Sequence, residues 1–304
     1  GSEAGYARWA AFLASGGLKT YAKRRNDSHD VRGVSRMSAY LNTGMVSPMR
    51  IAREASRATG SGKSKFLHEF LTWRGLAYAH FFHFPMPASG PTLLQLPPWA
   101  QETLRRRAHD RGKGVPRADL LAARSGHHAW DGMQRYLALT GELHNNARMG
   151  WGKAVAKWAT SPEEAMLLLV ELNDRFALDG HAPPSYGGLL GCLGLFEGPS
   201  ASESAILGRV SFRPPKDKYA NLPDRIPDLL ASAAAGLDCD GGKQAVGLHK
   251  FFPPSGGSPT APTAQRLALC RERPEARKEP ASSGVKRRWV ARLQPGVGCI
   301  DLTE

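Results

Sequence analysis

Residues 160–176 read TSPEEAMLLLVELNDRF, and this stretch decides the fold class. Ser161 can cap a helix by accepting a hydrogen bond from a first-turn amide, and Pro162 follows at a position where helices tolerate proline. Two acidic residues then face the positive end of the helix dipole, and the apolar residues after them recur at helical spacing. The stretch therefore predicts a helix over residues 162–176.

The same helical spacing occurs at residues 66–82, 130–143 and 147–158, with glycine- or proline-containing breaks between the segments. No stretch alternates apolar and polar residues for long enough to indicate a sheet. We therefore expect an all-α domain over residues 1–222. Residues 223–304 are rich in proline and glycine and also basic, which predicts a largely disordered tail with a short helix near residues 226–237.

Composition limits the possible functions. The chain has 304 residues, 41% of them hydrophobic, which is enough for a buried core. No apolar run approaches the length needed to cross a bilayer, so we expect no membrane association. The net charge of +14 favours a polyanionic partner without naming it. The four cysteines are scattered, which argues against a disulfide framework or a zinc site and favours a reducing intracellular compartment.

Three motifs have simpler interpretations. Residues 60–64, GSGKS, are similar to a phosphate-binding loop, but Arg57 stands where that loop requires glycine and no strand precedes it. We interpret the segment as a flexible connection between helices.

The pairs His80/His83 and His127/His128 lack nearby cysteines or clustered carboxylates, so we predict no metal site. Residues 297–304, VGCIDLTE, are similar to a SUMO-interacting motif, which would bind a protein partner as an edge strand.

Trp130, Trp151 and Trp158 lie on two adjacent predicted helices, and the spacing of seven puts Trp151 and Trp158 on one helical face. One interpretation is ordinary aromatic packing in the core. The other is a redox relay, because indole is among the side chains that are most easily oxidised. The sequence pattern by itself leaves both open.

Four ordered motifs resemble segments of the DNA photolyase and cryptochrome family. Residues 141–149, GELHNNARM, closely resemble the family segment that contains H-N-x-x-R-M. The other three are Tyr21 followed by residues 34–41 (VSRMSAYL), similar to the flavin-phosphate segment; residues 69–74 (EFLTWR); and residues 172–180 (LNDRFALDG), similar to class II photolyases and their bacterial relatives. The resemblance covers the all-helical, FAD-binding half of the family and not the antenna-binding half.

The resemblance implies that FAD binds non-covalently among the helices. Ser35 and Ser38 would offer hydroxyl and amide donors to its pyrophosphate. Arg148 would pair with Asp179 beside the isoalloxazine ring, and Asn173 would face flavin N5. The implied cofactor-binding residues are Tyr21, Ser35, Arg36, Met37, Ser38, Arg148, Asn173, Asp179 and Gly180. Without the surrounding motifs, Arg148 and Asp179 would be interpreted as a structural salt bridge.

The resemblance also implies repair of cyclobutane pyrimidine dimers in DNA by electron transfer from reduced flavin under blue light. Glu69, Trp73, Asn145 and Met149 match positions of the lesion pocket. The electron relay would run from Trp151, nearest the flavin, through Trp130 to Trp158, nearest solvent.

The sequence departs from the family at three positions. Gly191 stands where relatives usually carry a tryptophan that stacks on the dimer, and its loss would weaken dimer binding. In the phosphate segment, Val34 replaces threonine, which removes a hydroxyl, and Ala39 replaces proline, which loosens a turn. FAD binding is therefore better supported than DNA repair.

Three functions follow as alternatives. The leading one is a photolyase whose partners are dimer-containing DNA and an antenna domain or chain. The second is a cryptochrome-like blue-light photoreceptor that binds FAD without repairing DNA and signals through the tail, which Gly191, the long tail and the missing antenna half favour. The third is a scaffold that has lost its cofactor, for which Val34 is the only indication.

Overall fold

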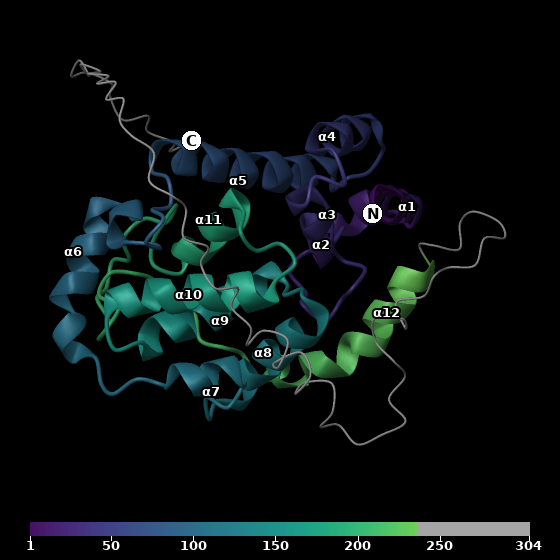
Figure 1. Ribbon diagram of the computed structural model, residues 1–304. Coiled ribbons are helices and arrows are strands. Elements are labelled where there is room, and N and C mark those ends of the chain that lie inside the picture. The colour runs from purple at the N-terminus through teal and green to yellow at the C-terminus, as the bar shows by residue number, and fades with distance from the viewer. Residues whose placement is uncertain (236–304) are drawn as a thin grey trace, which may run out of the picture. The chain divides into compact units, whose positions relative to one another are not determined.

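The computed structural model describes residues 1–235, and side chains through residue 231. Its α-helices are α1 Ser2–Ala14, α2 Gly17–Arg24, α3 Ser38–Asn42, α4 Pro48–Arg57, α5 Lys63–His83, α6 Pro98–Arg106, α7 Arg117–Leu121, α8 His128–Thr140, α9 Asn145–Trp158, α10 Pro162–Phe176, α11 Pro183–Gly191 and α12 Ile226–Ala235 (Figure 1). Three 3-10 helices are η1 Leu93–Gln95, η2 Ala108–Asp110 and η3 Asp217–Arg225. Apart from an isolated bridge between Ser204 and Gly208, these described residues form no β-pairing, so the predicted all-α class is confirmed for them.

The predicted tail is described only at its beginning. Residues 217–235 form η3 and α12, and Leu229 of α12 is buried in the core. The predicted domain boundary at residue 222 stays a prediction. The proposed disorder and the motif at residues 297–304 lie outside the described residues.

Two helix ends illustrate how local sequence sets the elements. Helix α10 begins as expected, because Ser161 Oγ accepts the backbone N–H of Glu164 at 3.0 Å and Pro162 is the first helical residue. Such a cap typically contributes about 1 kcal/mol. Helix α8 ends at Thr140, before the predicted end at residue 143, because Gly141 adopts a left-handed φ of 72° and donates its N–H to the carbonyl of Leu137.

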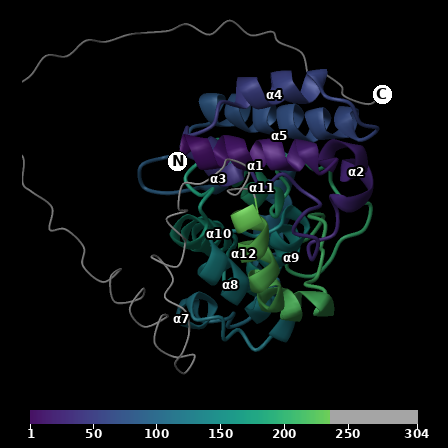
Figure 2. The same ribbon diagram turned by 90° about the vertical axis from the view of Figure 1, so that its right-hand side faces the viewer.

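Two clusters of buried apolar side chains form the core. The smaller cluster joins α1 to α4 with the beginning of α5 and includes Trp9, Ile51 and Phe66. The larger one is built mainly on α8 to α11 and extends to Phe81 near the end of α5. Helix α5 therefore links the clusters, with α4 along one side and α11 against another (Figures 1 and 2).

The 3-10 helix η3 packs very closely against α8 because α8 carries a glycine, Gly132, at the contact. A Cβ at Gly132 would lie 2.6 Å from the carbonyl oxygens of Tyr219 and Ala220, closer than real Cβ contacts. Tyr219 and Leu222 of η3 are buried against the larger cluster as a result. This packing brings Leu222 to the wall of the cavity described next.

Candidate functional site

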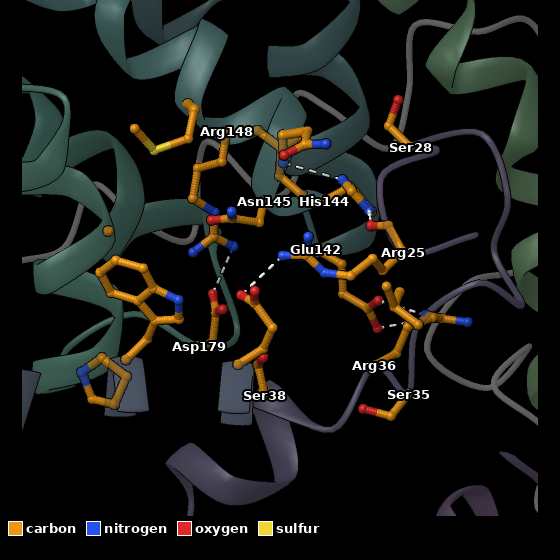
Figure 3. A pocket seen from close by; sticks show the side chains of 18 of the residues that line it. Arg25, Ser28, Ser35, Arg36, Ser38, Glu142, His144, Asn145, Arg148 and Asp179 are labelled. Carbon is orange, nitrogen blue, oxygen red and sulfur yellow. Dashed lines mark hydrogen bonds and ion pairs between the residues drawn. The ribbon is translucent and has the colours of Figure 1, made fainter. Parts of the chain in front are cut away.

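A cavity of about 590 Å³ lies where the two apolar clusters meet. Its wall comes from α2, the α2–α3 connection, α5, the turn between α8 and α9, and α11 (Figure 3). The volume falls in the range of small-molecule sites, roughly 300–1,000 Å³. Every residue predicted for catalysis or cofactor binding lines this cavity except Asn173 and Gly180.

The α2–α3 connection presents hydrogen-bond donors to the cavity. Ser38 is the first residue of α3, so the amides of that turn have no partner within the helix. Arg36 has a φ of 55°, which is uncommon for a residue other than glycine. Its guanidinium holds Glu142 through two bonds, Nε to Oε2 at 2.7 Å and Nη2 to Oε1 at 2.8 Å. The remaining nitrogen, Nη1, is buried and has no partner among the residues that the structure describes.

The predicted ion pair between Arg148 and Asp179 is present. Arg148 Nη2 donates to Asp179 Oδ1 at 2.8 Å, and the two side chains are 11% and 21% exposed (Figure 3). Arg148 Nη1 makes longer contacts of 3.4 Å with Asn173 Oδ1 and Ser185 Oγ, while its Nε is buried and lacks a partner within residues 1–235. The guanidinium is therefore held by protein groups and still has an unused donor.

Asp179 lies on the loop after α10, and backbone contacts fix that loop. The N–H of Leu178 donates to the carbonyl of Gly141 at 2.8 Å. From α3, Asn42 Nδ2 donates to the carbonyls of Leu178 at 3.1 Å and Gly180 at 2.7 Å. The loop is thus tied both to the α8–α9 turn and to α3, which carries Ser38.

Asn173 and Gly180 differ from the expectation. The side chain of Asn173 is 1% exposed, and its Nδ2 donates to Ser185 Oγ at 3.0 Å and Asp174 Oδ1 at 3.1 Å. The Asn173 amide therefore contacts the Arg148 guanidinium, through Oδ1, and does not line the cavity. Gly180 lies against α10, where an added Cβ would be 3.0 Å from Asp174 Cα, and it too is absent from the wall.

Glu69 lines the cavity as a doubly paired carboxylate. Its Oε2 lies 2.9 Å from Arg25 Nη2, and its Oε1 lies 2.6 Å from Lys65 Nζ. The Arg25 guanidinium also lies 5.9 Å from the centre of the Tyr21 ring, which packs edge-on against Phe66. Burial raises the pKa of the Tyr21 phenol, so this side chain stays neutral.

The other predicted lesion-pocket residues form a more apolar part of the wall. Trp73 is 46% exposed, and its ring lies 6.5 Å from that of Phe196. Met149 and Gly191 also line the cavity. A Cβ at Gly191 would meet only Met149 Cε, at 3.9 Å, so the space next to the Gly191 backbone can hold the first atoms of a larger side chain.

His144 fixes the beginning of α9, which carries Asn145 and Arg148. Its Nδ1 accepts the backbone N–H of Asn146 at 3.1 Å, and its Nε2 lies 2.9 Å from the carbonyl oxygen of Arg25. Since Nδ1 accepts, the proton is on Nε2, which donates to Arg25. Burial lowers the pKa of His144 and so favours this neutral form.

The three predicted relay tryptophans form a continuous row outside the cavity wall. The rings of Trp151 and Trp130 are nearly parallel, with centroids 6.1 Å apart and an interplanar angle of 6°. The ring centroids of Trp130 and Trp158 are 5.7 Å apart, and the two ring planes form an angle of 66°. Trp151 and Trp130 are fully buried, and Trp158 is partly exposed. Trp130 therefore lies between the other two tryptophans.

Several polar residues of the wall were missed by the sequence analysis. They are Arg25, Asp30, Arg74, Glu142, His144, Asn146 and Arg213. Arg74, Glu142, His144 and Asn146 belong to the motifs quoted above, and Arg25 follows Tyr21 by one helical turn, so a signal existed for these five. No sequence pattern pointed to Asp30 or Arg213.

The remaining motifs lie elsewhere. Residues 60–62 lie in the connection between α4 and α5, whereas Lys63 and Ser64 already begin α5, and the N–H of Gly62 donates to the carbonyl of Leu18. The described residues contain no group of three or more histidine, cysteine or acidic side chains arranged for a metal ion. Within the same part of the chain, no helix is both long and apolar enough to cross a membrane.

The chain is similar to several curated proteins named deoxyribodipyrimidine photo-lyase. It is 32% identical over 197 residues to that of Methanothermobacter thermautotrophicus, covering 64% of this chain and 42% of the relative. Identity to the Oryza sativa subsp. japonica protein is 30% over 199 residues, covering 64% and 39%, and to a Thermus thermophilus protein 36% over 182 residues, covering 58% and 40%. The chain thus spans about two fifths of the length of these relatives. No protein-family model matches it.

Proposed function

Because this chain belongs to the photolyase/cryptochrome family, we propose that it binds FAD in the cavity and uses blue light to repair cyclobutane pyrimidine dimers in DNA. One observation carries the proposal: the phosphate-segment serines, the Arg148–Asp179 pair and the Glu69–Trp73 helix face line one cavity of ligand size. These groups come from segments far apart in the sequence, so a purely structural role for each would not require a common hollow.

The donor set fits a dinucleotide that carries a pyrophosphate and a ring with a polar edge. The nitrogens Arg36 Nη1, Arg74 Nε and Arg148 Nε are buried without partners among residues 1–235, and all three residues line the cavity. A buried donor that lacks a partner is costly, whereas one that meets an anionic or carbonyl oxygen is stabilised. Such a ligand would supply those acceptors, with Ser35 and Ser38 adding hydroxyl groups.

When bound in its reduced form, FAD supplies an electron to the dimer after absorbing blue light and recovers it after the dimer has split. Arg148 would hold positive charge beside the ring and so stabilise negative charge on it. Asp179 neutralises Arg148 so that no lone charge is buried. Asn173 positions the guanidinium from behind, a role that replaces the expected contact with N5.

Glu69 would recognise the dimer by accepting a hydrogen bond. Paired with Arg25 and Lys65, it is an ionised carboxylate, and an ionised carboxylate only accepts. It therefore suits a pyrimidine N–H better than a carbonyl oxygen of the dimer. Asn145 and Met149 would complete the polar and apolar edges of the site.

Trp73 would support a dimer that has left the duplex. Flipping costs least for a damaged, poorly stacked step, and aromatic stacking contributes about 1–3 kcal/mol per base. Trp73 is exposed enough to offer a ring face, whereas Gly191 offers none. In this proposal Trp151, Trp130 and Trp158 deliver the electrons that keep the flavin reduced.

One observation favours a second candidate, a cryptochrome-like photoreceptor that binds FAD without repairing DNA. The wall at Gly191 lacks a side chain, and the nearest atom to a Cβ there would be Met149 Cε at 3.9 Å. A dimer bound beside Trp73 would then be stacked on one side only, so its affinity would be low. Light-dependent flavin reduction would persist without turnover of DNA.

The test is a repair assay on an oligonucleotide that contains one cyclobutane dimer, with FAD-loaded protein in blue light and in darkness. Photolyase activity predicts loss of the dimer in light alone, abolished by Glu69→Ala. The matched control Glu171→Ala removes a carboxylate paired with Arg117 on the surface and should repair normally. Bound flavin without repair would favour the photoreceptor, and absence of flavin would favour a scaffold that has lost its cofactor.

A further inference from the structure

The two inner tryptophans of the row both donate their indole N–H to an amide oxygen. Trp151 Nε1 donates to Gln134 Oε1 at 2.9 Å, and Trp130 Nε1 donates to the backbone carbonyl of Trp151 at 3.0 Å. Both bonds are fully buried. Amide oxygens accept hydrogen bonds but are very weak bases, so neither partner can take the proton away.

Gln134 is held in this position at an energetic cost. Its side chain is fully buried on α8, and its Nε2 has no hydrogen-bond partner in the described part of the chain. The amide orientation follows from chemistry, because an indole nitrogen only donates and must therefore face the oxygen. An apolar side chain would avoid the unpaired Nε2 but would leave the Trp151 N–H without an acceptor.

Trp158 at the outer end has a different environment. Its side chain is partly exposed, and none of the described residues accepts its indole N–H. Solvent can therefore reach this indole. The row therefore has two buried indoles bonded to amide oxygens and one indole open to solvent.

We propose that Gln134 is a positioning residue that keeps the indole proton on Trp151 during electron transfer, so that the positive charge moves outward and the proton is lost only at Trp158. The inference rests on the proposed relay. Trp151 would give one electron to the light-excited oxidised flavin, Trp130 would then reduce Trp151, and Trp158 would reduce Trp130. Trp158 would thus lose the one electron that the flavin accepts, and the N–H bond of Trp158 would break with its proton passing to water.

The location of proton loss decides whether charge separation survives. An oxidised indole is far more acidic than a neutral one, and a neutral radical on Trp151 could not be refilled by Trp130 without recovering a proton. An amide oxygen stabilises the positive charge while leaving the proton in place. A carboxylate at the same position would accept the proton and stop the charge at the first step.

The test compares Gln134→Glu with Gln134→Met by transient absorption after a laser flash on FAD-loaded protein, since protonated and neutral tryptophan radicals absorb at different wavelengths. The measurement is made at about pH 9 because burial raises the pKa of the introduced glutamate, which must be ionised. Gln134→Glu should then give an early neutral radical and about tenfold less long-lived charge separation. Gln134→Met introduces no base and should keep the protonated radical while slowing the first transfer. Gln101→Glu on α6, outside the row, is the control and should match the wild type.

The outcomes separate this inference from the relay itself. If Trp151→Phe leaves photoreduction unchanged, the relay is wrong. If Trp151→Phe abolishes photoreduction while Gln134→Glu behaves as the wild type, the relay holds and the role of Gln134 is refuted. A readout without flavin is hydrogen exchange of the Trp151 indole N–H by NMR, which should be slow in the wild type and faster in Gln134→Met; equal exchange would also count against Gln134.

Discussion

Replacing Arg148 by methionine tests the cavity wall where the structure is most specific. Methionine keeps an unbranched side chain but removes the guanidinium that bonds Asp179 at 2.8 Å. Breaking a fully buried pair costs about 3–5 kcal/mol, but Asp179 is 21% exposed and can be partly hydrated, so we expect a loss of about 2 kcal/mol in unfolding free energy.

The same substitution should weaken FAD binding. A hydrogen bond to a charged group contributes about 1.5–3 kcal/mol, and about 2 kcal/mol corresponds to a roughly 30-fold higher Kd. Urea denaturation without flavin measures the stability change, and equilibrium titration with FAD measures the affinity. The control Arg117→Met breaks an exposed pair with Glu171, so it should cost under about 1 kcal/mol and leave FAD binding unchanged.

The double variant Arg148→Met/Asp179→Asn separates binding from folding. It removes the lone carboxylate, so part of the lost stability should return, whereas FAD affinity should stay low because the guanidinium is still missing. Arg148→Met that binds FAD within about threefold of the wild type would refute the assignment of Arg148 to the ligand.

Three further predictions concern other parts of the site. Trp151→Phe should slow flavin photoreduction at least about tenfold relative to Trp99→Phe, since indole supplies the first electron; identical kinetics would contradict the relay. Gly191→Trp should tighten binding of a dimer-containing oligonucleotide about tenfold through stacking, and no gain would mean that this wall does not face the lesion. His144 has a lowered pKa in the folded state, so the unfolded chain binds the proton first and unfolding free energy should fall as the pH drops below about 6.5. His144→Asn should flatten this dependence in urea titrations, and an unchanged slope would assign it to another group.

Much of the cavity wall was predictable because it is carried by short motifs. Ser35, Arg148 and Asp179 stand at motif positions, and the structure brings them to one hollow. The start of α10 was predictable for a local reason, since Ser161 and Pro162 specify a helix start independently of the rest of the chain.

The misplaced residues depend on packing that one sequence does not reveal. Asn173 lies in the last turn of α10, and whether that turn faces the cavity or α11 is decided by how α10 lies on its neighbours. The end of α8 was placed too late because Leu143 continues the apolar spacing, while the left-handed Gly141 ends the helix. Gln134 was missed because a glutamine on a helix usually indicates a surface position.

A calorimetric titration of the purified chain with FAD and, separately, with riboflavin tests the central claim most directly, because riboflavin carries the same ring without the pyrophosphate. We predict one FAD site per chain and an affinity at least about a hundredfold higher for FAD than for riboflavin, since Ser35, Ser38 and Arg36 of the phosphate segment would bind the phosphates. Equal weak binding of both compounds, or no saturable binding of FAD, would contradict the account.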